Sequence, residues 1–309
     1  MVKIASVFSG QGSQYPGMGK DLCDNFKIAR DIYECAGDIF GFDVAKVSFE
    51  GSEIELSDAA VTQPVIFTLS AAAFSVSKGE IPEFSATAGH SLGEYAALWS
   101  AGVYSLEDGM RLIKLRAGAM AKAAKANPGV MYAVLGADGQ AVEAACAQAG
   151  GMAMAVNYNM PSQTVISGEE AACAKAAEIL IGQGHKAIKL PVGGAFHTPM
   201  MQSGADELFE GAKAINYSKP NLDFYSNLTG KLVKEELDYP DYFAKHMVNP
   251  VRFVDQVRAM SDDSITTFIE FGPKKTLSGL IKKNNKAAAA VCVEDAQSLK
   301  KVIEQINAK

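Results

Sequence analysis

The hydrophobic and polar positions of this chain alternate between stretches with the period of a strand and stretches with the period of a helix. Residues 3–9, KIASVFS, form a short apolar run that ends at a glycine cluster, which predicts a buried strand. Apolar residues recur with helical spacing over 21–37 and over 60–78. Residues 84–91, FSATAGHS, predict a second strand that enters a turn, and residues 92–102 predict the helix that follows it.

The pattern changes between about Gly129 and Pro191. It reads strand, helix, strand, strand, helix, strand, with short apolar runs as the strands and alanine-rich stretches as the helices. This is the order of a ferredoxin-like βαββαβ unit. Because the unit interrupts the main pattern, we predict an inserted subdomain over 128–192. The large domain is then discontinuous, with residues 1–127 and 193–309.

The main pattern returns after the predicted insert. Residues 224–230 and 266–272 read as strands, whereas residues 276–283 and 296–309 read as helices. Strands that alternate with helices favour a mostly parallel sheet that is covered by helices on both faces. The predicted fold class is therefore α/β.

Composition and charge narrow the classes of protein to which the chain can belong. Apolar residues make up 48% of the 309 residues, and the net charge of −6 argues against a nucleic-acid partner, which would require a basic face. No window reaches the roughly 18 apolar residues of a membrane helix, so no membrane partner is expected. The five cysteines are scattered and the four histidines form no HxxxH or HExxH pattern. We therefore expect reduced thiols, a cytoplasmic location and no metal site.

Residues 89–93, GHSLG, place one serine between two glycines, directly after a predicted strand and directly before a predicted helix. This context is typical of a nucleophile elbow. The tight turn leaves no room for side chains at Gly89 and Gly93, and it would hold Ser91 at the carboxyl edge of the sheet. The N-terminus of the next helix favours negative charge there. We predict that Ser91 is a nucleophile, and the alternative is a structural serine in a turn.

A serine nucleophile needs a base, and histidine is the first candidate. His90 adjoins Ser91, but neighbouring side chains diverge on a sharp turn. His185 lies in a polar stretch of the predicted insert. His197 and His246 remain, and spacing favours His197 because it follows the insert in a glycine-rich loop.

The group that would orient this base is not evident in the sequence. Asp206 and Asp255 are the nearest carboxylates, and neither has a persuasive setting. A backbone carbonyl could hold the imidazole tautomer instead. A serine hydrolase would usually carry an Asp or Glu followed by a His near the end of the chain, and that order is missing.

Arg116 lies on the apolar side of a predicted helix that begins after Ser105. Ser105 and Asp108 read as a capping box. At 100° per residue, Arg116 falls among apolar side chains such as Leu112 and Met120. A buried guanidinium needs an anion or hydrogen-bond acceptors. Two interpretations stay open: an internal ion pair, or a bidentate clamp on a substrate carboxylate.

The glycine cluster SGQGSQ near the N-terminus does not support a dinucleotide cofactor. It lacks the third glycine of the GxGxxG fingerprint, because Tyr15 stands at that position. Its glycines would instead allow the backbone N–H of Gln11 to approach a reacting carbonyl.

Eight ordered blocks make the chain similar to a known family. The blocks are FSGQGSQYPGMG, TQPVIFTLS, GHSLGEYAALWSAGV, KLRAGAM, VNYNMPSQTVISG, AFHTPMM, NPVRF and EFGPKKTLSGLIKK. Together they resemble malonyl-CoA:acyl carrier protein transacylase, the acyltransferase family of fatty-acid and polyketide synthesis, over nearly the whole chain. The resemblance implies an α/β-hydrolase-like core with a ferredoxin-like insert, which agrees with the hydrophobic pattern.

The resemblance also implies roles for particular residues. Ser91 would be acylated, His197 would be the base, and Arg116 would bind the malonyl carboxylate. The other implied residues are Gln11 and Leu92 in the oxyanion hole, Gln63, Asn157 and Asn159 along the pocket, and His246, whose main chain would orient the base. The family commonly has glutamine where His246 stands, and the triplet AFH resembles the malonyl-preferring variant.

The implied reaction is a ping-pong transfer of a malonyl group from malonyl-CoA to the phosphopantetheine thiol of an acyl carrier protein. It needs no cofactor besides the coenzyme A thioester, and we expect a monomer. The alternatives are a serine thioesterase or hydrolase of acyl-CoA and a non-catalytic scaffold that binds the carrier protein. Lys274, Lys275 and the run 282–286 are candidates for docking an acidic carrier, or else form a merely solvated helix end.

Overall fold

The computed structural model of this protein describes residues 3–307. Its strands are β1 (Lys3–Phe8), β2 (Ala86–Gly89), β3 (Val130–Leu135), β4 (Ala153–Met160), β5 (Gln163–Gly168), β6 (Lys186–Lys189), β7 (Asp223–Phe224), β8 (Ile265–Phe271) and β9 (Ala289–Val293). Its helices before the second sheet are α1 (Lys20–Asn25), α2 (Lys27–Phe40), α3 (Val44–Glu50), α4 (Glu53–Ser57), α5 (Ala59–Ser77), α6 (Gly93–Ser100) and α7 (Leu106–Ala126). The later helices are α8 (Gly139–Ala149), α9 (Glu170–Gly182), the 3₁₀ helix η1 (Pro199–Met201), α10 (Gln202–Ala212), α11 (Tyr239–Val248), α12 (Phe253–Asp262), α13 (Thr276–Asn284) and α14 (Ala296–Asn307).

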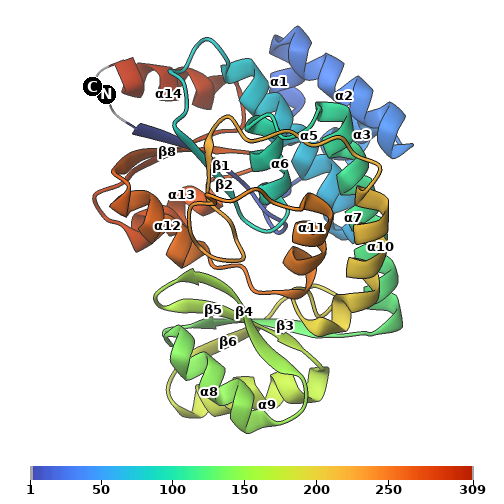
Figure 1. The fold of residues 1–309 in the computed structure, drawn as a ribbon, viewed down its shortest axis with the longest axis vertical. Helices are drawn as coiled ribbons and strands as arrows, with labels where there is room; N and C mark the ends of the chain where they lie inside the picture. The colour runs from blue at the N-terminus through green and yellow to red at the C-terminus, as the bar shows by residue number, and fades with distance from the viewer. Residues whose placement is uncertain (1–2, 308–309) are drawn as a thin grey trace.

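A parallel sheet forms the centre of the large part of the molecule (Figure 1). Its five strands run in the order β7-β2-β1-β8-β9. Side chains of β1 alternate between two cores, as the pleat of a strand requires. Ile4 and Phe8 pack with α5, whereas Ala5 and Val7 pack with α12 and α13. The predicted parallel sheet with helices on both faces is confirmed.

Helix α5 is buried almost all round, because it packs against α2, α6 and α7 as well as against β8. By length and composition it could span a membrane, but 83% of its apolar window is buried inside the protein. The expectation that no window reaches this length is therefore wrong. The burial identifies α5 as a core helix of the fold.

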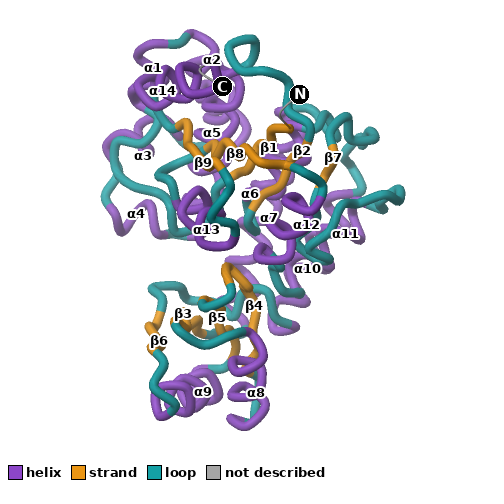
Figure 2. The backbone as a smooth tube through the Cα atoms, turned by 90° about the vertical axis from the view of Figure 1, so that its left-hand side faces the viewer, coloured by secondary structure: helices purple, strands orange, loops and turns teal. Residues whose placement is uncertain are grey.

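A second sheet carries α8 and α9 on one face, and it lies below the large part in Figures 1 and 2. Its four strands are antiparallel and run in the order β4-β5-β3-β6. The predicted βαββαβ unit is confirmed by this order of elements. The boundaries at 127/128 and 192/193 stay a prediction. Single bridges between Pro128 and Gly194 and between Asn157 and Val251 connect this sheet to the large part.

Several elements differ from the prediction, and helices α3, α4, α10, α11 and α12 were not predicted. The helix expected over 21–37 is divided at Phe26, whose extended backbone separates α1 from α2. The strand expected over 224–230 is only β7, because the chain turns away after Phe224. Strand β9 was not predicted, since it begins inside the alanine run 287–290, and alanine is depleted in strands. The cap of α7 is present, with Ser105 accepting a hydrogen bond from the backbone N–H of Asp108.

Candidate active site

Ser91 lies in the turn between β2 and α6, at the carboxyl end of the parallel sheet. Its φ angle is 51°, in the left-handed region that side chains rarely adopt. A Cβ atom at Gly89 would lie 2.1 Å from the carbonyl carbon of Gly93, and one at Gly93 would lie 1.9 Å from the carbonyl oxygen of Phe8. Only glycine fits at either position. The glycines at both ends of the GHSLG segment are therefore required sterically, as the sequence suggested.

His197 is the histidine that meets Ser91. Its Nε2 atom lies 2.8 Å from Ser91 Oγ. Its Nδ1 atom lies 3.1 Å from the carbonyl oxygens of both His246 and Asn249. Since two carbonyls face Nδ1, that nitrogen carries the proton, and Nε2 is left to accept from the serine hydroxyl.

The electrostatic surroundings keep His197 neutral. Burial, and then the charge of Arg116, lower the pKa of His197 to about 3. His246 is also completely buried, and burial lowers its pKa well below the ordinary value. A neutral imidazole is the form that can take a proton from Ser91.

Backbone carbonyls, rather than a carboxylate, hold the imidazole of His197. The carboxylate of Asp255 is paired with Arg252 and Arg258, and that of Asp206 accepts a hydrogen bond from Gln202. The structure therefore favours the backbone-carbonyl interpretation that the sequence left open. His246 contributes its main chain, as the resemblance implies, and Asn249 was not foreseen.

Arg116 brings a buried positive charge to the same place. Its side chain is 1% exposed, its Nη1 donates to Gln63 Oε1 at 2.6 Å, and its Nη2 donates to Ser91 Oγ at 3.0 Å. Within residues 3–307, the guanidinium takes part in no ion pair, and its Nε has no hydrogen-bond partner. Of the two open interpretations, the internal ion pair is absent among the described residues, and the clamp on a substrate carboxylate stays a prediction.

The two predicted oxyanion donors lie on loops that pack together. A Cβ atom at Gly10 would lie 2.6 Å from the carbonyl oxygen of His90, so the loop after β1 presses against the elbow. Within the described part of the chain, the backbone N–H groups of Gln11 and Leu92 donate to no other residue. Both groups are therefore available to a ligand.

Of the two predicted pocket residues of β4, Asn159 contacts the elbow. Asn159 Oδ1 lies 2.8 Å from His90 Nε2, and the carbonyl oxygen of Asn159 accepts from Asn284. The Oδ1 atom of Asn157 is buried without a hydrogen-bond partner in the described chain. His90, which is a poor candidate for the base, thus joins the second sheet to the nucleophile loop.

Sequence reasoning missed a buried polar cluster behind the nucleophile. Asn227 Oδ1 accepts from the backbone N–H of Ser91 at 2.7 Å, and the backbone N–H of Asn227 donates to Glu94 at 2.6 Å. Tyr242 donates to the same carboxylate. The strand predicted over 224–230 obscured the signal: Asn227 follows the end of β7, and polar residues at the carboxyl ends of neighbouring parallel strands meet.

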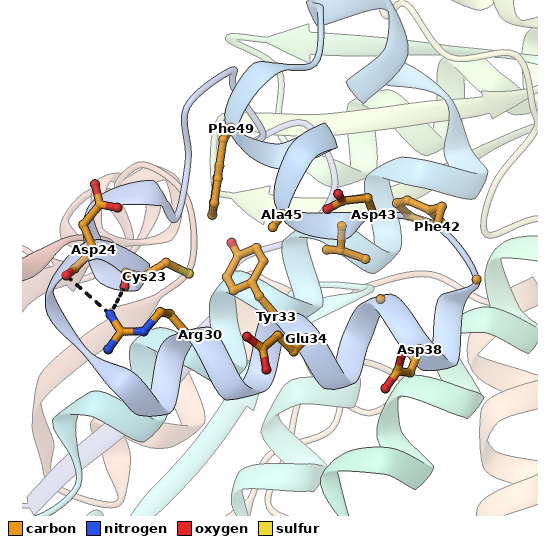
Figure 3. A pocket seen from close by; sticks show the side chains of 13 residues that line it. Cys23, Asp24, Arg30, Tyr33, Glu34, Asp38, Phe42, Asp43, Ala45 and Phe49 are labelled. Atoms are coloured by element: carbon orange, nitrogen blue, oxygen red, sulfur yellow. Dashed lines mark hydrogen bonds between the residues drawn. The ribbon is translucent and has the colours of Figure 1, made fainter.

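A groove of about 780 Å³ between α1, α2 and α3 is separate from this site (Figure 3). Its lining includes Cys23, Tyr33 and Phe49, and it contains none of the predicted site residues. Arg30 in the groove already donates to the backbone carbonyls of Cys23 and Asp24. Over residues 3–307, no cluster of three or more His, Cys, Asp or Glu side chains could hold a metal ion.

Comparison with known proteins decides the family. A family model described as an acyl transferase domain matches residues 6–304. The malonyl CoA-acyl carrier protein transacylase of Bacillus subtilis (strain 168) is 35% identical over 312 residues, covering 99% of this chain and 98% of that protein. This chain belongs to the malonyl CoA-acyl carrier protein transacylase family. The transacylase of Escherichia coli (strain K12) is 31% identical over 310 residues, with 98% and 100% covered.

Solved transacylase structures have the same fold. The malonyl CoA-acyl carrier protein transacylase from Clostridium perfringens superposes with a TM-score of 0.95 at 35% identity, covering 99% of this chain and 98% of that one. A type II PKS acyl-carrier protein has been solved in complex with its malonyl-transacylase. That transacylase superposes with a TM-score of 0.94 at 32% identity, covering 98% and 99%. The α/β core with its βαββαβ insert is therefore the transacylase fold.

Proposed function

We propose that this protein is a malonyl-CoA:acyl carrier protein S-malonyltransferase that acts through a malonyl-serine intermediate at Ser91. One observation carries the proposal: Ser91 Oγ lies 2.8 Å from His197 Nε2 and 3.0 Å from Arg116 Nη2. A nucleophile, a neutral base and a buried cation meet at a single atom. The names of the relatives support malonyl-CoA as the donor and an acyl carrier protein as the acceptor.

Acylation begins when His197 Nε2 takes the hydroxyl proton of Ser91 and the oxygen attacks the thioester carbon. The carbonyl oxygen of the thioester becomes an oxyanion, which accepts hydrogen bonds from the backbone N–H groups of Gln11 and Leu92. Each such donor typically contributes about 3 kcal/mol to stabilising the transition state. When the tetrahedral intermediate collapses, the C–S bond breaks, and His197 returns the proton to coenzyme A, which leaves as the thiol.

The free carboxylate of the malonyl group selects the acyl chain. Arg116 binds it with its guanidinium, whose Nη1 is oriented by Gln63. Asn159 of β4 contacts His90 in the elbow, and together with Asn157 it would line the pocket from the second sheet. An acetyl group has no carboxylate, so it leaves the buried charge of Arg116 unpaired.

Deacylation repeats the steps with a new thiol. His197 takes the proton of the phosphopantetheine thiol, the sulfur attacks the ester carbon of malonyl-Ser91, and the serine recovers its proton. A groove of about 750 Å³ is lined by four lysines and two carboxylates, and its net positive charge would suit an acidic carrier protein. The lysines are Lys274, Lys275, Lys282 and Lys301, and the carboxylates are Glu294 and Asp295. The acyl donor is itself the coenzyme A thioester, so the steps require no further cofactor.

Three further expectations belong to this proposal. The protein works in the cytoplasm, and it works as a monomer. Residues 128–192 form the ferredoxin-like subdomain, and residues 1–127 and 193–309 form the catalytic domain, in agreement with the placement of the two sheets.

Intact-mass analysis after incubation with malonyl-CoA tests the proposal. The expected result is a gain of one malonyl group that disappears when a phosphopantetheine-bearing carrier protein is added, and Ser91→Ala gains nothing. A serine hydrolase would instead lose the adduct to water at the same rate without carrier. A non-catalytic scaffold would never gain the mass, and an equal gain in Ser91→Ala would reject the proposed nucleophile.

A further inference from the structure

Every polar atom of Asn227 is used in hydrogen bonding around the nucleophile. The side chain is completely buried, its Oδ1 accepts from the backbone N–H of Ser91 at 2.7 Å, and its Nδ2 donates to the carbonyl oxygen of Gly89 at 2.6 Å. Its backbone N–H donates to Glu94 Oε2 at 2.6 Å, and its backbone carbonyl accepts from Arg252 at 2.9 Å. The carboxamide therefore closes a clamp across the elbow, with one bond on each side of His90.

The elbow needs such a clamp because its conformation is costly. Ser91 has a φ angle of 51°, and residues held in that region persist only where the surrounding structure determines them. The two bonds from Asn227 define the directions of the peptide groups that flank His90 and thereby aim Ser91 Oγ. They also occupy the N–H of Ser91, which leaves the N–H of Leu92 as the donor in the elbow that is available to an oxyanion.

Asn227 is in turn held by α6 and α11. Glu94 of α6 accepts from the Asn227 backbone and from the hydroxyl of Tyr242, at 2.5 Å, and it is 1% exposed. Tyr242 also bonds Ser226, the neighbour of Asn227, at 2.6 Å. The side chain of His246, one turn further along α11, places Nε2 at 3.3 Å from Asn227 Oδ1.

The same helix orients the base. The carbonyl oxygen of His246 lies 3.1 Å from His197 Nδ1, and the side chain of His246 contacts Asn227. Ser91 and His197 are 106 positions apart in the chain, yet both are supported by one buried set of hydrogen bonds. A small displacement in this set would move both reacting groups relative to each other.

We propose that Asn227 is a positioning residue for the acyl transfer, acting through the backbone of the elbow and held by Glu94 and Tyr242. It never touches the substrate. Its hydrogen bonds determine where Ser91 Oγ points rather than how malonyl-CoA is bound. Replacing Asn227 therefore lowers the rate of acylation and leaves the affinity for malonyl-CoA unchanged. This inference rests on the proposed function.

The test compares Asn227→Leu with a matched control. Leucine keeps the number and branching of the side-chain heavy atoms of asparagine, although its methyl groups are larger, and it removes both bonds to the elbow. Gln256 of α12 is equally buried, and its Nε2 donates to the backbone carbonyl of Tyr225, outside the clamp. Gln256→Met therefore also leaves a buried backbone group unpaired, at a similar cost in stability. The rate of acylation by malonyl-CoA is measured by quenched intact mass over a range of concentrations, together with the melting temperature of each variant.

We expect Asn227→Leu to lower the saturating acylation rate by about tenfold to a hundredfold, with a change of less than about twofold in the half-saturating concentration. Gln256→Met should keep the wild-type rate. Three results would each overturn the positioning role. They are an unchanged saturating rate in Asn227→Leu, an equal decrease of that rate in Gln256→Met, and an effect of Asn227→Leu on the half-saturating concentration alone.

Three further outcomes have a defined meaning. If Asn227→Leu does not fold, Asn227→Asp carries the test, because it keeps an oxygen for Ser91 N–H and loses the donor to Gly89. Asn227→Asp should then show an intermediate rate, and a wild-type rate would reject the inference. If the wild-type protein itself gains no malonyl group, the proposed function falls, and the inference falls with it. If the wild-type protein is acylated and the Asn227 variants are acylated at the same rate, the inference is rejected while the proposed function stands.

Discussion

Replacing Arg116 with glutamine should abolish the preference for malonyl-CoA over acetyl-CoA. The guanidinium is 1% exposed, and within residues 3–307 it has no ion-pair partner, so a substrate carboxylate is the anion that its position can serve. Glutamine keeps a polar side chain, although it is two bonds shorter, and carries no charge. The variant therefore removes the charge-assisted pair while leaving Gln63 in place.

The size of the effect follows from the two bonds that a carboxylate can make. A hydrogen bond to a charged group contributes about 1.5–3 kcal/mol, so a bidentate pair contributes about 3–6 kcal/mol. The cost of burying the carboxylate offsets part of this. Taking the lower end, and about 1.4 kcal/mol per factor of ten, we expect the ratio of malonyl to acetyl transfer to fall about a hundredfold.

A competition assay measures that ratio directly. The protein is mixed briefly with equal concentrations of malonyl-CoA and acetyl-CoA, and the two acyl-Ser91 products are weighed by intact mass. Arg116 Nη2 also donates to Ser91 Oγ, so the variant changes the absolute rate as well, but this effect cancels in a ratio taken within one sample. Lys114→Gln is the control, because Lys114 is on the same helix and donates to Ile39 at the surface. Retention of the malonyl preference in Arg116→Gln would refute the carboxylate clamp.

Two pH dependences also follow from the buried groups. Burial and the charge of Arg116 lower the pKa of His197 to about 3. We therefore expect kcat/KM for malonyl-CoA to stay level between about pH 5 and 8 and to fall only at lower pH, where the base becomes protonated. An inflection near pH 6.5 would contradict this. Burial raises the pKa of Glu94 from 4.5 to about 8, so in this window the unfolded chain binds fewer protons than the folded protein. The contribution of Glu94 to the free energy of unfolding is therefore greatest below pH 4.5. The free energy of unfolding of the wild-type protein relative to Glu94→Gln should fall between pH 4.5 and pH 8 by up to about 1.4 kcal/mol per pH unit, and parallel denaturant-derived curves for the two proteins would count against it.

Most of the fold could be predicted from local sequence patterns. The period of apolar residues indicated β1, α5 and the βαββαβ unit. A helix or strand that buries one face, or all of its faces, has apolar residues at a regular spacing along the chain. The failures have local causes as well. β9 begins inside the alanine run 287–290, and the extended backbone of Phe26 divides a helix whose apolar spacing continues through it.

The candidate site, like the fold, was predictable from the sequence only where local patterns identify its residues. Ser91 was identified because a sharp turn between strand and helix demands glycines at fixed offsets, and Arg116 because a charge inside an apolar stripe is visible by counting. Spacing could only favour His197 over His246. In the structure both take part, His197 with its side chain and His246 with its carbonyl oxygen.

The buried cluster around Asn227 shows the limit of local patterns. Asn227 and Ser91 are 136 positions apart, and Glu94 and Tyr242 are 148 positions apart. These residues come together because β7 and β2 are neighbours in the sheet and end at the same edge, with α6 and α11 packed beside them. Turn geometry and amphipathic spacing depend on residues that are close together in the chain, so both can be recognised in the sequence. The pairing of a strand with a distant neighbour depends on the whole packed core, and therefore the partners of Ser91 and His197 became visible only once that core was assembled.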